Sequence, residues 1–145
     1  VVAAHRVVML HELGRTRAEL LSVPERVGAV LLEAIREGSA IPEAAYLDAL
    51  ATLAALRARV WAAFSPPALL VLPAAPGPAP VGEATGDPTF AIVATALSGP
   101  TATIPAGRCA ATGMPLGALL TRAPGTDAAL ARLLLAAGPE SPLSD

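Results

Sequence analysis

The chain has 145 residues, of which 54% are hydrophobic and 15% are charged, whereas an ordinary soluble domain carries about 25% charge. This length suits one domain with a sizeable core. The low charge predicts that part of the apolar surface faces another protein segment. All ten basic residues are scattered arginines, and the net charge is −2. We therefore expect no nucleic-acid partner, because phosphate binding requires clustered cations.

Membrane association, metal binding and cofactor binding are also not expected. No apolar run reaches the ~20 residues of a membrane-spanning helix, and no signal peptide is visible. Cys109 is the single cysteine, which excludes a disulfide within the chain. Neither metal-ligand spacing nor a glycine-rich phosphate-binding fingerprint occurs. A cytoplasmic location without cofactors is the resulting expectation.

The first half of the sequence predicts three helices, at about 3–20, 24–37 and 42–64. The second follows a capping box in which Ser22 caps and Glu25 sits in the first turn, and Gly38 is expected to end it. In the third, apolar positions step by three or four, as on one helix face. That stripe consists of Tyr46, Leu50, Leu53, Leu56, Val60 and Phe64.

The second half predicts short buried strands. The apolar run at about 69–72 is bounded by prolines, which is typical of a strand buried on both faces. A loop rich in proline and glycine follows at 73–88, and then a short helix within 89–99. Further buried strands are expected at about 101–104 and 115–121, joined by a Pro/Gly turn. A closing helix at 126–137, capped by Thr126, and a flexible tail at 139–145 complete an α/β chain, whose three short strands call for further neighbours.

The titratable side chains do not predict a catalytic site. His5 and His11 are six residues apart, unlike a metal-binding pair on one helix face. A base-and-partner role for His11 and Glu12 is one interpretation, but a packed or surface histidine is the plainer one. Cys109 has no histidine near it in sequence, so we interpret it as an inert turn residue. Glu37 is interpreted as a solvated carboxylate on the polar face of its helix.

Four blocks in a fixed order carry a resemblance to a known family. They are "REGSAIPEAAYLDAL" at 36–50, "FSPPALLVLPAAPGPAP" at 64–80, "SGPTATIPAGRCAATGMPLGALL" at 98–120 and "GTDAALARLLLAAG" at 125–138. Together they resemble the C-terminal portion of the amidase signature family. The most specific part is "PAG" at 105–107 combined with "GMPLG" at 113–117.

The resemblance implies that residues 1–145 are one partial domain of an α/β/α amidase fold, with a mixed sheet flanked by helices. It further implies hydrolysis of the carboxamide C–N bond of a small-molecule substrate by a Ser-Ser-Lys mechanism. The 145 residues contain no lysine, and their six serines are scattered. We therefore expect no catalytic residue here and no activity of the chain alone. Its partner would be the N-terminal remainder of the same amidase domain, and a homodimer of the complete protein is compatible with the resemblance.

Substrate contacts, if this chain supplies any, are expected between positions 90 and 100. The candidates are Phe90, Thr95 and Ser98. In the amidotransferase branch of the family, an arginine on the long helix recognises a glutamine substrate, but Leu53 stands at that position. Asp87 lies one place out of register with that branch's second recognition acid. These departures favour a general amidase with a small or apolar amide substrate.

Two alternatives remain open from the sequence. The chain could be a non-catalytic Ala/Pro-rich binding module, in which "PAAPGPAP" at 73–80 adopts polyproline geometry and binds a partner. This interpretation leaves residues 99–138 unexplained. The chain could also be the product of a truncated gene, without a function of its own.

Overall fold

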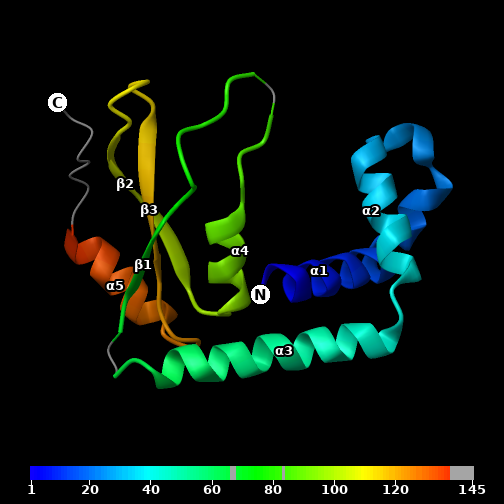
Figure 1. The fold of residues 1–145 in the computed structure, drawn as a ribbon, viewed down its shortest axis with the longest axis horizontal. Coiled ribbons are helices and arrows are strands. Elements are labelled where there is room, and N and C mark those ends of the chain that lie inside the picture. Colours follow the sequence, from blue (N-terminus) through cyan, green and yellow to red (C-terminus); the bar gives the residue numbers. More distant parts are fainter. Residues whose placement is uncertain (66–67, 83, 138–145) are drawn as a thin grey trace. The chain divides into compact units, whose positions relative to one another are not determined.

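The computed structural model describes residues 1–65, 68–82 and 84–137. The chain divides into two compact units, Val1–Ala58 and Arg59–Asp145. Figure 1 shows the order of the elements: helices fill the first unit, whereas the second combines helices with a small sheet. The predicted α/β class is therefore confirmed. The expected tail at 139–145 and the prolines at 66 and 67 lie outside the described residues.

The first unit is built on the packing of α1 (Val2–Thr16) against α2 (Ala29–Ala40). Leu10, Leu32 and Ile35 are buried. Two glycines allow the backbones to touch: a Cβ on Gly38 would lie 1.8 Å from the carbonyl oxygen of Leu10, and one on Gly14 would lie 2.4 Å from a backbone nitrogen of the other helix. The prediction that Gly38 ends its helix is therefore wrong, because the glycine serves close helix packing inside α2.

The boundaries of the first two helices also differ from the predicted ones. The chain leaves α1 at Thr16 and forms two short 3₁₀-helices, Ala18–Ser22 and Pro24–Arg26, before α2 begins. The predicted capping box does not form, because the hydroxyl of Ser22 donates to the carbonyl of Glu19, 2.7 Å away. The carbonyl of Gly28 instead accepts the first bonds of α2, at 3.0 and 3.1 Å.

The long helix α3 (Glu43–Ala62) agrees with the predicted helix at 42–64 to within two residues. Its apolar stripe is less uniform than predicted. Within the stripe Leu53 is buried, whereas Phe64 lies beyond the helix end and is exposed. Ala49, which is outside the predicted stripe, is buried as well. Trp61, near the end of α3, belongs to the second unit. Its indole nitrogen donates a hydrogen bond to the carbonyl of Leu97 in the same unit, 3.2 Å away.

The sheet of the second unit has the order β1-β3-β2, with both pairs antiparallel. The strands are β1 (Leu70–Pro73), β2 (Thr101–Arg108) and β3 (Pro115–Thr121). The expected hairpin between the last two strands is confirmed. Its first strand is four residues longer than predicted, because the pairing continues past an irregularity between Pro105 and Gly107. Proline is tolerated at such a bulge, where no ladder hydrogen bond is required from its nitrogen.

Burial follows the position of each strand. At the end of the central strand β3, Leu119, Leu120 and Thr121 are all buried. Val71 in β1 is 59% exposed, and Ile104 in β2 is also exposed. The strand predicted at 69–72 is therefore not buried on both faces. Of the three strands that were expected to be buried, only β3 is buried, at its last three residues.

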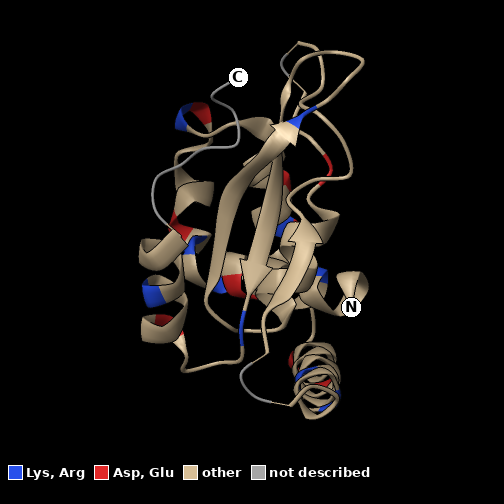
Figure 2. Ribbon diagram, turned by 90° about the vertical axis from the view of Figure 1, so that its left-hand side faces the viewer, with Lys and Arg blue, Asp and Glu red and all other residues tan. Residues whose placement is uncertain are grey.

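Two helices complete the second unit, α4 (Thr89–Ala96) and α5 (Asp127–Ala137). They supply the buried residues Ala94, Ala96 and Leu130. Thr126 stands directly before α5. Its carbonyl accepts the N–H groups of Ala129 and Leu130 at 3.0 Å, and its hydroxyl donates to the carbonyl of Ala123 at 2.6 Å. Charge is sparse here: Figure 2 shows a sheet that is almost entirely tan, because Arg108 is the one charged residue in the three strands.

Within the described part of the chain, no helix combines the length and apolar character that a membrane crossing needs.

Candidate functional site

The second unit contains an open apolar groove of about 1100 Å³. One wall is the loop that follows β1, which is rich in proline and alanine. The floor is the end of the sheet next to the β2–β3 turn. The lining residues are 71–80, Gly86, Asp87, 103–106, Cys109 and 115–118.

Asp87 is the one charged side chain in the groove lining. Its carboxylate accepts two hydrogen bonds from Thr89, one from the backbone N–H at 2.8 Å and one from the hydroxyl at 2.5 Å. These bonds favour the ionised form, and they lower the pKa of Asp87 below its ordinary value. The groove therefore carries a fixed negative charge at neutral pH.

Cys109 lines the groove at the start of the β2–β3 turn. The turn is closed by backbone bonds from Cys109 N–H to Met114 carbonyl and from Gly113 N–H to Cys109 carbonyl, both 2.8 Å long. The hydroxyl of Thr112 and nearby backbone N–H groups bond to the thiol, and they lower its pKa. No base stands beside the thiol in the groove lining, whose other members are apolar apart from Thr103 and Asp87.

The three residues expected to contact substrate all lie outside the groove lining, on α4 or directly after it. Phe90 is half-buried and Thr95 is exposed, both on α4. Ser98 follows the helix in a left-handed conformation, with φ 55°. Their role in substrate contact stays a prediction.

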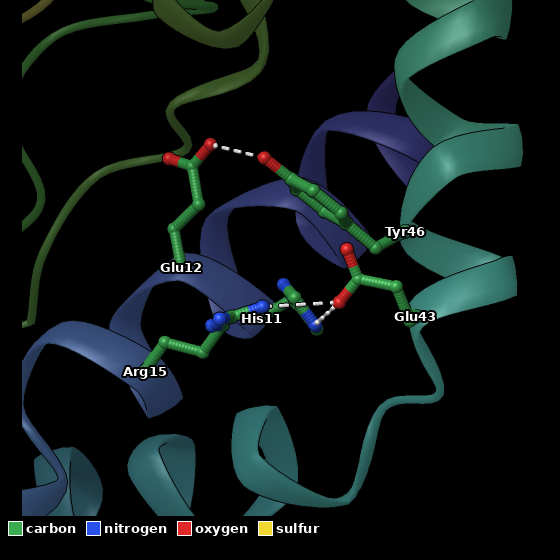
Figure 3. Close-up of polar contacts among 5 residues, drawn as sticks. All are labelled: His11, Glu12, Arg15, Glu43 and Tyr46. Atoms are coloured by element: carbon green, nitrogen blue, oxygen red, sulfur yellow. Dashed lines mark hydrogen bonds and ion pairs between the residues drawn. The ribbon is translucent and has the colours of Figure 1, made fainter.

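A polar cluster that sequence reasoning missed lies in the first unit, between α1 and the first turns of α3 (Figure 3). His11 is 5% exposed, and its ring stacks on that of Tyr46 with 4.2 Å between centroids. Its Nε2 atom lies 3.4 Å from a carboxylate oxygen of Glu43, which also accepts a hydrogen bond from Arg15 at 3.1 Å. The hydroxyl of Tyr46 donates to Glu12 at 3.1 Å.

This arrangement corrects the interpretation of His11 and Glu12 as a base and its partner. Glu12 bonds to Tyr46, and the carboxylate that faces His11 is that of Glu43. The hydrogen bond from Tyr46 to Glu12 favours the neutral phenol and raises the pKa of Tyr46. The packed-histidine interpretation is confirmed. Within the described ranges, no group of three His, Cys, Asp or Glu side chains could hold a metal ion.

Comparison with solved structures identifies the fold. No protein-family model matches the chain, and no curated protein matches its sequence. The crystal structure of an amidase, however, superposes with a TM-score of 0.78 at 28% identity, covering 94% of this chain and 35% of the amidase chain. The chain has the fold of one part of an amidase.

A second solved structure supports the same assignment of the fold. It belongs to a vestigial protein complex that reveals the evolutionary origins of an s-triazine catabolic enzyme. The TM-score is 0.76 at 24% identity, and the match covers 96% of this chain and 34% of the other. The chain thus spans about a third of the length of each solved structure, and the rest of the amidase fold has no counterpart in these 145 residues.

Proposed function

We propose that this chain is the C-terminal segment of an amidase-type hydrolase, and that it supplies structure and pocket surface while the catalytic groups lie elsewhere. The complete enzyme cleaves the C–N bond of a small-molecule carboxamide. In the proposed Ser-Ser-Lys mechanism a serine oxygen adds to the carbonyl carbon, the amine leaves, and water then releases the acid.

The observation that carries the proposal is the coverage of the fold match. An amidase superposes on 94% of this chain, although only 35% of the amidase is used. Four sequence blocks that resemble the C-terminal portion of the amidase signature family occur in the same order along the chain. The breadth of the match favours this function over a polyproline-type binding module, which accounts for the loop at 73–80 alone.

The sequence lacks residues that the proposed mechanism needs, which supports the proposal that the catalytic groups lie elsewhere. A serine hydroxyl is a weak nucleophile until a base accepts its proton, and the 145 residues contain no lysine. The serines of the first unit are engaged with the backbone: Ser22 donates to Glu19 and Ser39 donates to Ile35, at 2.7 and 2.8 Å. We propose that the lysine and both catalytic serines belong to the N-terminal remainder of the domain.

The distribution of apolar surface also favours a larger assembly. Val30 on α2 is 87% exposed, Val71 on β1 is 59% exposed and Leu135 on α5 is 82% exposed. Each buried methylene stabilises a protein by about 0.8 kcal/mol, so covering such side chains would favour association with the remainder of the domain. A cytoplasmic location and a homodimer of the complete enzyme belong to the same proposal.

The experiment that tests the proposal is a segment exchange. The part of the amidase that superposes on this chain is replaced by the 145 residues, and amide hydrolysis by the chimera is measured. We expect activity above that of the same amidase with the segment deleted. A second chimera that carries Ile35→Asp, which places a charge at a fully buried position, is the control and should be inactive. A soluble chimera with no more activity than the deletion variant would contradict the proposal.

A further inference from the structure

The turn between α4 and β2 contains Ser98, the one non-glycine residue with a positive φ angle among the residues that the structure describes. Its φ is 55°, a left-handed conformation in which Cβ crowds the backbone and which few residues other than glycine adopt. Such a conformation persists only where surrounding contacts hold it, and positions of this kind cluster at functional sites. The contacts on either side of Ser98 therefore bear on function.

On the side of α4, the turn is held by an aromatic side chain from another helix. Leu97 is 3% exposed, and its N–H donates to the carbonyl of Val93 at 3.1 Å. Its carbonyl accepts a hydrogen bond from the indole nitrogen of Trp61 at 3.2 Å. That carbonyl belongs to the peptide group that leads into Ser98, so the indole fixes the orientation on which the φ angle of Ser98 depends.

On the side of β2, the turn is held by the end of β3. The carbonyl of Pro100 accepts the N–H of Arg122 and the hydroxyl of Thr121, both at 3.2 Å. Gly99 rests on the same strand end, because a Cβ at that position would lie 1.7 Å from the carbonyl oxygen of Arg122. The left-handed residue is thus held between the end of α3 on one side and β3 on the other.

We propose that Trp61 is a positioning residue for substrate binding. Its hydrogen bond keeps Ser98 left-handed, and this conformation fixes the end of α4, which carries the exposed Thr95. This role rests on the proposed function and goes beyond it, because Trp61 lies outside the segment at 90–100 where substrate contacts are expected. Trp61 acts through the turn without touching the substrate. Contacts that are placed in advance increase affinity, since binding does not have to order them.

The chimera that tests the proposed function also tests this role, through its KM and kcat. Trp61→Phe keeps an aromatic ring and removes the N–H donor, so the peptide group before Ser98 is free to rotate. We expect KM to rise about fivefold, the factor equivalent to one net hydrogen bond. The kcat value should be unchanged, because only substrate binding is weakened. Phe64→Leu, at an exposed position beyond the end of α3, is the matched control and should leave KM within about twofold.

Ser98→Gly separates positioning from stability. Glycine occupies the left-handed region without strain, so adding Ser98→Gly to Trp61→Phe should return KM to within about twofold of the unsubstituted chimera. The hydrogen bond itself is not replaced, so Trp61→Phe should still lower the urea midpoint of unfolding in the Ser98→Gly background. If Trp61 only stabilises the fold, Trp61→Phe lowers this midpoint and leaves KM unchanged.

The 145-residue chain gives a second readout that does not depend on catalysis. The N–H of Arg122 donates to the turn at Pro100, so its hydrogen-exchange rate, measured by nuclear magnetic resonance, shows whether the turn is in place. Trp61→Phe should raise this rate about fivefold, and the added Ser98→Gly should lower it again. The N–H of Gly113, which bonds to the carbonyl of Cys109 in the β2–β3 turn, should exchange at the same rate in every variant.

Three results would overturn the role of Trp61. They are an unchanged KM for Trp61→Phe in an active chimera, a raised KM that Ser98→Gly does not restore, and an unchanged exchange rate at Arg122 in the chain alone. An inactive unsubstituted chimera would instead contradict the proposed function, and the exchange rates would still decide whether Trp61 holds the turn.

Discussion

Gly38 shows how a single residue determines the packing of the first unit. The sequence suggests a helix stop at this position, because glycine is common after the last turn of a helix. In the structure the glycine lies within α2, where its missing side chain lets the helix rest on the carbonyl of Leu10. Gly14 has the same role on α1. The pair therefore determines how closely α1 and α2 approach.

Gly38→Ala is expected to destabilise the chain by about 1–3 kcal/mol, because the new methyl group meets backbone atoms that cannot rotate away. Urea denaturation followed by circular dichroism measures the change. Gly77→Ala is the matched control, since a Cβ at that position has open space around it, and its effect should stay within about 0.5 kcal/mol. Equal unfolding free energies for the two variants would show that the helices do not touch at Gly38.

Thr121 has a comparable role at the end of β3. It is fully buried, and its hydroxyl donates to the carbonyl of Pro100 at 3.2 Å. Thr121→Val preserves the shape and removes this bond, so a loss of about 1 kcal/mol in unfolding free energy is expected. Thr103→Val, at an exposed position of β2, should change the unfolding free energy by less than about 0.5 kcal/mol. A value for Thr121→Val as small as that of the control would refute the role of the hydroxyl.

At the scale of the elements, an ion pair joins α1 to α2. Arg6 donates two hydrogen bonds to the carboxylate of Glu37, one of them 2.7 Å long. These bonds, more than the charge alone, lower the pKa of Glu37 below its ordinary value. Because the folded-state pKa is lowered, the stabilisation is present above the pKa of the unfolded chain and is lost as the pH falls through the folded-state pKa.

Glu37→Gln should therefore reduce the unfolding free energy at pH 7 and have a smaller effect in acid, below the ordinary pKa of a glutamate at about 4.3. Both chains are unfolded with urea over this pH range. In an Arg6→Gln background, the pH dependence of the substitution should disappear, which isolates the pair from other titrating groups. If the difference between the two chains is the same at every pH, the ion pair does not stabilise the packing of α1 on α2.

Elements with a strong local signal were predictable, and those that depend on distant contacts were not. The long helix from Glu43, the strand at 115–121 and the hairpin follow from apolar periodicity and turn residues. The start of α2 was misplaced, because Ser22 bonds to its own 3₁₀ turn. Which strands are buried depends on the order β1-β3-β2, and a local pattern does not encode this order.

The candidate sites also depend on contacts between distant parts of the sequence, so they were not predictable. A single apolar run does not reveal the groove, since its walls come from three strands and a loop. The cluster around His11 was missed because Glu43 and Tyr46 lie more than thirty residues further along the chain. The block at 36–50, which contains Tyr46, indicated the resemblance to the family. It gave no indication that Tyr46 contacts His11.

At the scale of the whole molecule, the chain is explained as one part of a larger fold. An amidase covers 94% of it with 35% of its own length, and the 145 residues lack the lysine that the proposed chemistry requires. Exposed apolar side chains such as Val30 and Leu135 are consistent with a neighbour that covers them. We therefore propose that the catalytic groups lie in the other part of the fold and that this chain contributes pocket surface.

The most direct measurement is amide hydrolysis in three samples: this chain alone, an amidase that lacks the segment matched here, and the two co-expressed and co-purified. We predict no turnover above the buffer rate for either part alone and measurable turnover for the pair. Hydrolysis by the 145-residue chain alone, retained after purification to homogeneity, would contradict the assignment of the catalytic groups to the remainder of the domain.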